Sequence, residues 1–220
     1  MKAALFSIFV LFNVCLLQAN PHKYSTFYYQ RATLFAQLPV YPSDIIFLGN
    51  SITNGCEWSE LFNNKHVKNR GISGDIVQGV YDRLEPILTG KPEKIFLLIG
   101  INDLAAGASP DSIVKGINKI AEQIKHESPR TKLYIQSLLP VNNTFSTFKN
   151  HTSKGQEVID TNKMLKVLCL KKHLTYIDLY DSFKEPGDDK MNPKYTNDGL
   201  HLLGPGYLLW EKIEAPYIRK

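Results

Sequence analysis

Short apolar runs alternate with longer amphipathic segments along most of the chain. Four runs rich in β-branched and aromatic residues predict strands that are buried on both faces: residues 44–48, 94–99, 132–139 and 174–178. Glycine or proline directly follows the first three runs. A fifth and more polar run, at residues 66–69, is typical of a strand at the outside of a sheet.

The segments between these runs have the periodicity of helices. Four isoleucines recur every three or four residues and so share one face: Ile113, Ile117, Ile120 and Ile124. Ser109 and Pro110 stand before them as a helix cap and a first-turn proline. Residues 157–171 and the aromatic-rich residues 24–38 are further expected helices, the latter outside the sheet. This alternation predicts an α/β fold in which helices cover both faces of a parallel sheet.

The first 19 residues have a different character. A positive charge at Lys2 is followed by an apolar run to Leu17, and Ala19 is a small residue at the expected cleavage position. Leu17 stands where a small residue is preferred, but the run is shorter than the roughly 20 residues that span a bilayer. We interpret residues 1–19 as a signal peptide. Residues 20–220 then form one secreted or periplasmic domain with no stable membrane insertion.

The composition narrows the function classes. A chain with 43% hydrophobic and 21% charged residues is ordinary for a globular protein, which excludes disorder, collagen and coiled coil. The net charge is +5, or +4 without Lys2, and it is scattered, so nucleic acid is not an expected partner. Cys56 and Cys169 remain after cleavage, and no bridge between them is expected. No metal-binding motif is present, and neither a metal nor another cofactor is predicted.

Candidate chemistry follows the strands, because ligands of an open parallel sheet bind beyond its carboxyl ends. Ser51 follows the first strand at a turn into a helix, where free backbone N–H groups favour the negative charge of an attacked carbonyl. Gly71 and Gly74 follow the second strand, and Asn102 follows the third. Taken singly, Ser51 and Asn102 are also good helix caps, and the glycines fit an ordinary turn.

The last candidate pair lies near the end of the chain. Asp198 precedes His201 by three residues, a spacing that allows the carboxylate to turn back onto the imidazole and orient it. The other histidines are interpreted as structural or solvated: His22, His66, His126, His151 and His173.

The order of these features carries more information than any one of them. Residues 49–52, 69–74, 100–103 and 198–201 together resemble the four sequence blocks of the SGNH hydrolases, also called GDSL esterases or lipases. The resemblance extends over residues 44–207. It implies a flavodoxin-like, three-layer α/β/α sandwich with a five-stranded parallel sheet.

The same resemblance implies a role for each matching residue. Ser51 would be the nucleophile, His201 the general base and Asp198 the residue that orients the base. The backbone N–H groups of Ser51 and Gly74 and the side chain of Asn102 would form the oxyanion hole.

Two features suggest a substrate class. Asn50 replaces the family's usual aspartate, which places the chain nearer the carbohydrate-acting and platelet-activating-factor-acetylhydrolase-like branches than the lipases. No lid insertion is seen, and the polar residues 141–154 and 183–196 are expected to form the site walls, with Phe145 or Phe148 against a sugar ring. We therefore expect a serine esterase that removes short acyl groups, principally acetyl, from a carbohydrate. The alternatives are a lysophospholipase or thioesterase with the same site, and an inactive sugar-binding relative.

Overall fold

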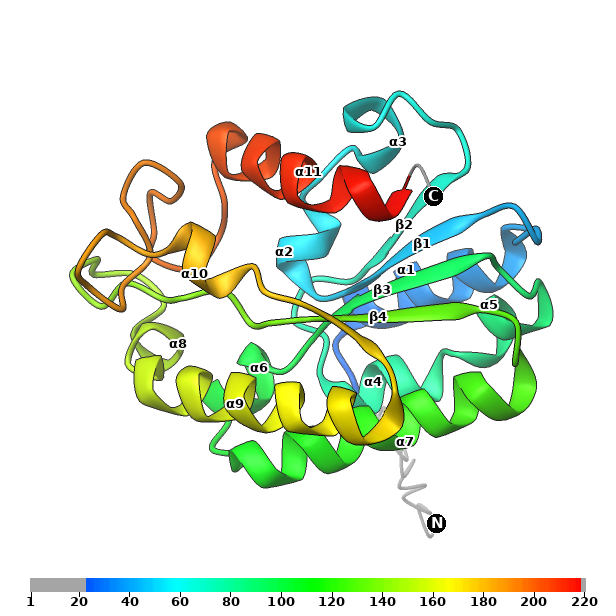
Figure 1. Ribbon diagram of the computed structural model, residues 1–220, viewed down its shortest axis with the longest axis horizontal. Helices are drawn as coiled ribbons and strands as arrows, with labels where there is room; N and C mark the ends of the chain where they lie inside the picture. Colours follow the sequence, from blue (N-terminus) through cyan, green and yellow to red (C-terminus); the bar gives the residue numbers. More distant parts are fainter. Residues whose placement is uncertain (1–22, 219–220) are drawn as a thin grey trace, which may run out of the picture.

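The computed structural model describes residues 23–218, so the predicted signal peptide and His22 lie outside the described residues. One parallel sheet forms the centre of the molecule (Figure 1). Its strands are β1 (Ile45–Gly49), β2 (Val67–Gly71), β3 (Lys94–Leu98), β4 (Lys132–Gln136) and β5 (Thr175–Ile177). The strand order is β2-β1-β3-β4-β5, and every neighbouring pair is parallel. The predicted five-stranded parallel sheet is confirmed.

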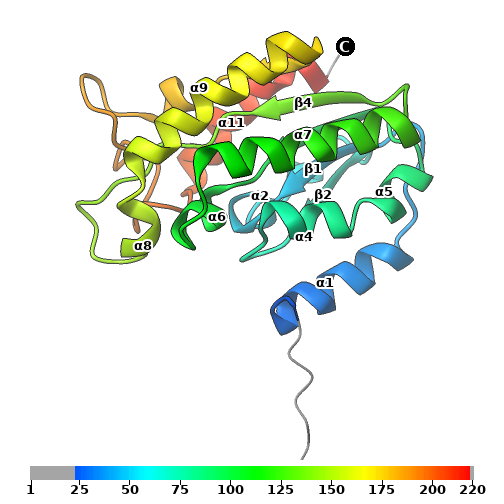
Figure 2. The same ribbon diagram turned by 90° about the horizontal axis from the view of Figure 1, so that it is seen from below.

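The helices form a layer on each face of this sheet (Figures 1 and 2). One layer contains α2 (Ser51–Asn54), α3 (Trp58–Leu61) and α11 (Gly204–Ile218). The other contains α4 (Val77–Asp82), α5 (Glu85–Thr89), α7 (Pro110–Glu127) and α9 (Gly155–Lys172). The short helices α6 (Ile101–Ala105), α8 (Lys149–Thr152) and α10 (Tyr180–Phe183) follow β3, β4 and β5. The three-layer α/β/α sandwich is thus confirmed.

The central strands are continuous apolar runs because helices cover them on both sides. β1 and β3 are buried at every position. Aromatic rings stack across three neighbouring strands, with Phe96 between Phe47 of β1 and Tyr134 of β4 at centroid distances of 4.9 and 4.5 Å. The predicted stripe of isoleucines on α7 is buried against this core. These contacts hold the strand ends in fixed positions, and the strand ends carry the candidate site.

Helix α1 (Thr26–Gln37) packs at the β2 edge of the sheet, as the aromatic-rich sequence predicts. Tyr28 and Phe35 are its buried residues, and they pack with Ile72, which directly follows β2. The Tyr28 hydroxyl also donates to the carbonyl of Gly79 in α4, at 2.8 Å. The helix therefore supports the turn that leads from β2 to α4.

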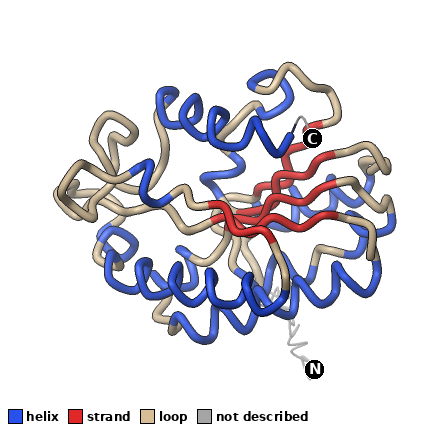
Figure 3. Tube along the Cα trace, viewed as in Figure 1, coloured by secondary structure: helices blue, strands red, loops and turns tan. Residues whose placement is uncertain are grey.

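The longest loops gather at one end of the molecule (Figure 3), and the strand arrows of Figure 1 point toward this end. Cys56 and Cys169 are both buried and unpaired. In residues 23–218 no helix has both the length and the apolar character that crossing a membrane requires.

Candidate active site

The site residues lie where the chain reverses the direction in which strands are added. From β1 the chain goes to β2 on one side, and later to β3 on the other side. The carboxyl ends of β1, β2 and β3 therefore lie at a topological switch point, which is the usual ligand site of such sheets. Ser51, Gly74 and Asn102 follow these three strands.

Ser51 is the first residue of α2, and its side chain is not the helix cap. That role belongs to Asn50, whose Oδ1 accepts a hydrogen bond from the backbone N–H of Ile52 at 3.1 Å. The capping interpretation of Ser51 is therefore wrong. The Ser51 hydroxyl instead lies 3.0 Å from Nε2 of His201.

His201 connects Ser51 to Asp198. Nδ1 of His201 lies 2.8 Å from Oδ2 of Asp198, while the other carboxylate oxygen accepts the backbone N–H groups of Leu200 and His201, at 2.8 and 2.7 Å. Partial burial raises the pKa of Asp198, but these N–H groups and the imidazole outweigh it and hold the pKa below its ordinary value. An ionised carboxylate only accepts hydrogen bonds, so Nδ1 of His201 carries the proton and Nε2 is free to accept one from Ser51.

Gly74 and Asn102 follow β2 and β3. Gly74 has φ +78°, a conformation that glycine adopts without strain, and no heavy atom beyond its chain neighbours lies within 4 Å of the position that a Cβ would take. Asn102 donates from Nδ2 to the carbonyl of Asp75, the neighbour of Gly74, at 2.8 Å. The N-cap of α6 is Gly100, so Asn102 does not serve as the cap.

A buried ion pair between Arg83 and Asp75 links the turns that follow β1 and β2. Arg83 of the α4–α5 junction donates from Nε to Asp75 at 2.8 Å and from Nη2 to the carbonyl of Gly49 at 3.1 Å. One guanidinium thus joins the ends of β1 and β2, and Asp75 extends the link to Asn102 after β3. The sequence carries no spacing signal for Arg83, because its partners are fixed only by the tertiary fold.

His151 of α8 is a site residue that the sequence interpretation missed. Its Nε2 lies 3.0 Å from Oδ1 of Asn102, so reading it as merely structural or solvated needs correction. Burial lowers the pKa of His151, and the nearby His201 adds to this effect. Its sequence position in a polar loop gives no indication of this contact, because the loop is 49 residues from Asn102.

Phe148 forms part of the wall of the site on the side of this loop. Its ring lies at 4.9 Å from the His201 ring and 5.8 Å from the His151 ring, edge-on in both cases. The side chain is nevertheless 45% exposed. Thr147 ties the loop to the turn before His201 by donating to the carbonyl of Asp198 at 2.9 Å. Residues 141–154 thus border the site, as expected.

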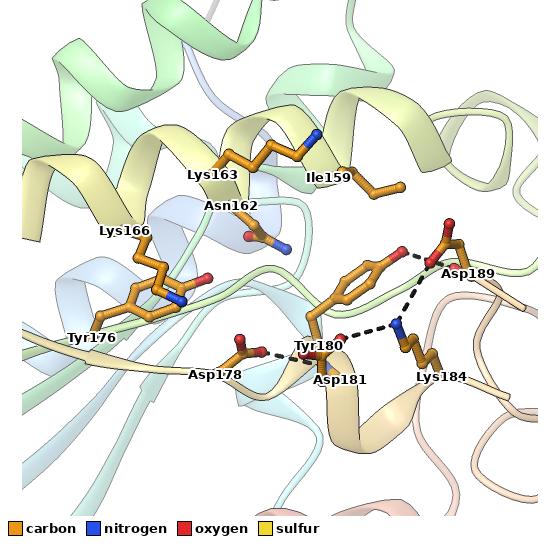
Figure 4. A pocket seen from close by; sticks show the side chains of 10 residues that line it. All are labelled: Ile159, Asn162, Lys163, Lys166, Tyr176, Asp178, Tyr180, Asp181, Lys184 and Asp189. Carbon is orange, nitrogen blue, oxygen red and sulfur yellow. Dashed lines mark hydrogen bonds and ion pairs between the residues drawn. The ribbon is translucent and has the colours of Figure 1, made fainter. Parts of the chain in front are cut away.

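The second expected wall, residues 183–196, contributes charged side chains to a different cavity. Lys184 and Asp189 line a hollow of about 300 Å³ between α9 and α10, together with Tyr176 and Tyr180 (Figure 4). Lys184 pairs there with Asp181 at 3.0 Å and with Asp189 at 3.7 Å. None of the five predicted site residues is among those that line this hollow.

Comparison with known proteins agrees with this geometry. Residues 47–209 match the GDSL-like Lipase/Acylhydrolase family, a stretch that includes Ser51, Asn102 and His201. The chain belongs to this family. It is accordingly an ester hydrolase of the GDSL acylhydrolase type, and the resemblance seen in the four sequence blocks is confirmed. Among residues 23–218, no group of three or more His, Cys, Asp or Glu side chains has an arrangement that could hold a metal ion.

Individual relatives of this ester hydrolase differ in the substrates that their names imply. It is 28% identical over 171 residues to platelet-activating factor acetylhydrolase IB subunit alpha2 of Rattus norvegicus, covering 74% of this chain and 71% of that protein. A GDSL-like lipase from Bacteroides thetaiotaomicron has the same fold, with a TM-score of 0.75, 24% identity and coverage of 87% of this chain and 97% of that chain. An acetyl-xylooligosaccharide esterase from Geobacillus Stearmophilus also shares it, with a TM-score of 0.65, 15% identity and coverage of 82% and 96%.

Proposed function

We propose that the protein is a serine esterase that removes short acyl groups, principally acetyl, from a carbohydrate. The observation that carries the proposal is the continuous chain of contacts from Ser51 through His201 to Asp198. A base 3.0 Å from a hydroxyl and held by a carboxylate is the arrangement that nucleophilic serine catalysis requires.

The reaction follows from the proton positions at this site. Nε2 of His201 takes the Ser51 proton while Oγ forms a bond to the ester carbonyl carbon. The imidazolium then returns this proton to the leaving alcohol as the C–O bond breaks, which leaves an acyl-enzyme. Water attacks the acyl-enzyme with His201 again as the base, and the acid and free Ser51 result.

The negative charge of the tetrahedral intermediate requires hydrogen-bond donors close to the attacked carbonyl. We assign this role to the backbone N–H groups of Ser51 and Gly74 and to the amide of Asn102. No acceptor for either N–H is found among the described residues, so both are free to donate to a ligand. Asn102 uses one of its two amide hydrogens on Asp75, which leaves the second for the oxyanion.

The choice of acetyl rests on the relatives and on the loops. The names of the rat and Geobacillus relatives both specify an acetyl group, although they differ in the alcohol. The wall next to His201 is polar apart from Val141, Phe145 and Phe148, and the exposed Phe148 side chain lies beside the base. Hydroxyl groups and a sugar ring suit such a wall better than an acyl chain does. The predicted signal peptide supports a secreted or periplasmic location.

An acetylated phospholipid is the second candidate substrate, because the rat relative is named for platelet-activating factor. Acetate release from acetylated xylo-oligosaccharides and from platelet-activating factor separates the two candidates. We expect faster release from the oligosaccharides, and the reverse preference would replace the carbohydrate by the phospholipid. Labelling of Ser51 by a fluorophosphonate tests activity itself, and an unlabelled protein would support the inactive sugar-binding alternative.

A chain-length series tests the acyl side, and with it the lysophospholipase or thioesterase alternative. A tunnel that buried the six additional methylenes of octanoate would favour octanoate over acetate by about 5 kcal/mol, on the order of 10³-fold in kcat/KM. We expect no such gain, and p-nitrophenyl acetate should be the better substrate. A clear preference for the octanoate would contradict the short-acyl proposal.

A further inference from the structure

The side chain of Asn102 is held at both ends of its amide. Nδ2 donates to the carbonyl of Asp75 at 2.8 Å, and Oδ1 lies 3.0 Å from Nε2 of His151. A carbonyl only accepts hydrogen bonds, so the amide nitrogen must be the end that faces Asp75. The end that faces His151 is therefore the oxygen, and Nε2 of His151 must be the donor.

This assignment fixes the form of the second histidine. With the proton on Nε2, the neutral ring has a bare Nδ1, and that atom is buried without a hydrogen-bond partner. A charged ring would place a second N–H there with no acceptor, which is unfavourable for a buried group. The neutral ring is also favoured by the nearby His201, which meets the same Phe148 ring edge-on.

We propose that His151 is a positioning residue for the oxyanion donor Asn102. Its Nε2–H holds Oδ1 of Asn102, so that Nδ2 keeps one hydrogen on Asp75 and presents the other to the reacting carbonyl. A hydrogen bond accepted at Oδ1 also polarises the amide, which makes its N–H a stronger donor. The inference rests on the proposed function, since it assumes that Asn102 stabilises the oxyanion.

The surroundings of His151 support this role. The residue lies in α8, and the Phe148 ring meets its imidazole edge-on at 5.8 Å. The following residue, Thr152, is buried, and its methyl group lies against Gly199 in the turn that carries Asp198 and His201. The loop after β4 thus reaches both halves of the site: it contacts His201 through Phe148 and Asn102 through His151.

Two substitutions of His151 test the proposal, one that removes the donor and one that restores it. His151→Ala should lower kcat for p-nitrophenyl acetate by about 5- to 10-fold, the rate equivalent of one ordinary hydrogen bond, with KM little changed. His151→Gln should recover most of the loss, because its amide N–H can reach the same oxygen. His126→Ala, at an exposed residue in the last turn of α7, is the matched control and should behave like the wild type.

A double-mutant cycle with Asn102 decides whether the two residues act together. Asn102→Ala alone should lower kcat by about 10²–10³-fold. In that background, His151→Ala should change kcat by less than about twofold, because no donor remains to be positioned. A full additional loss in the Asn102→Ala background, no effect of His151→Ala, or no rescue by glutamine would each overturn the proposal. Thermal unfolding of each variant shows whether a loss of kcat reflects a loss of fold.

The same cycle separates the inference from the function on which it rests. If Asn102→Ala leaves kcat unchanged, the oxyanion role of Asn102 is wrong, and the positioning role of His151 fails with it. If Asn102→Ala has its expected effect while the His151 loss is additive, only the positioning role fails. Fluorophosphonate labelling of Ser51 in the wild type reports independently on the nucleophile.

Discussion

The two sides of the active site are built in different ways. Ser51, Gly74 and Asn102 follow directly after strands of the central sheet, and Asp75 and Arg83 link their turns through buried hydrogen bonds. The opposite side consists of loops after β4 and β5, which carry the two histidines and Phe148. We call these the strand-end side and the loop side.

The difference indicates how the work of the site is divided. Groups on the strand-end side are set by the rigid sheet, so they suit the placement of a nucleophile and of fixed donors to an oxyanion. The loop side reaches the site through longer connections that tolerate sequence variation. It supplies the base and the exposed wall toward the alcohol. Substitutions on the strand-end side should therefore change the chemical step or stability, and those at the exposed wall should change substrate preference.

The largest effect is expected where the two sides meet, at Ser51 and His201. Ser51→Ala and His201→Ala should each lower kcat on the order of 10⁴–10⁶-fold, and the double variant should lose little more, because both residues serve the same proton transfer. Rates of p-nitrophenyl acetate hydrolysis measure the effect. Ser59→Ala, at an exposed serine of α3, is the control. Losses that multiply in the double variant would show that the two residues act in separate steps.

The strand-end side could be predicted from the sequence because its residues are adjacent to strands. A continuous apolar run identifies each buried strand, and the next few residues must then lie at the sheet edge. Ser51, Gly74 and Asn102 were found in this way, and Asp198 with His201 by their own close spacing. Contacts such as that between Ser51 and His201, 150 residues apart, required the resemblance to a family.

The residues that were missed depend on tertiary contacts alone. Arg83 is a buried cation whose partners follow two different strands, and His151 lies in a polar loop without periodicity. The expected strand at residues 132–139 ends as β4 at Gln136, although the apolar sequence continues. Beyond it, the Ser137 hydroxyl accepts the backbone N–H groups of Leu179 and Tyr180, so these buried residues form a loop in place of a strand. Apolar character predicts burial there, but not the backbone pairing.

A stability measurement tests the strand-end side without reference to catalysis. Asp103 follows Asn102, and burial raises its pKa from 3.8 to about 6, although the N–H of Val77 opposes this shift. Between pH 3.8 and about 6, the Asp103 carboxyl therefore keeps its proton in the folded protein and is ionised in the unfolded chain. The free energy of unfolding falls as the pH rises through this range. The difference corresponds to about 3 kcal/mol at most.

Asp103→Asn removes the charge and keeps an oxygen that can accept from Val77. Relative to the wild type, the variant should gain up to about 3 kcal/mol in the free energy of unfolding at neutral pH, and little near pH 4. Urea denaturation at both pH values measures the gain. Asp111→Asn, at an exposed residue of α7 that pairs with Lys115, is the control. An equal gain at both pH values would show that the pKa of Asp103 is not raised in the fold.

The smallest effect is expected at the exposed wall of the loop side. Phe148 is 45% exposed, so its truncation should leave the free energy of unfolding within about 0.5 kcal/mol of the wild type. If its ring stacks on a sugar, Phe148→Ala should raise KM for acetylated xylo-oligosaccharides by about 2- to 10-fold, the equivalent of about 0.5–1.5 kcal/mol for an aromatic contact. Phe148→Trp should keep KM near the wild-type value. Phe27→Ala, at an exposed aromatic residue of α1, is the control.

The small ester p-nitrophenyl acetate makes this last comparison decisive. It presents no sugar ring to the wall, so Phe148→Ala should leave both its kcat and its KM close to the wild-type values. The edge-on contact between Phe148 and His201, at 4.9 Å, offers a second way for the substitution to act, through the position of the base. In that case kcat would fall equally for both substrates and KM would not change. Such a result would assign the exposed wall to the chemical step, and its assignment to substrate preference would be wrong.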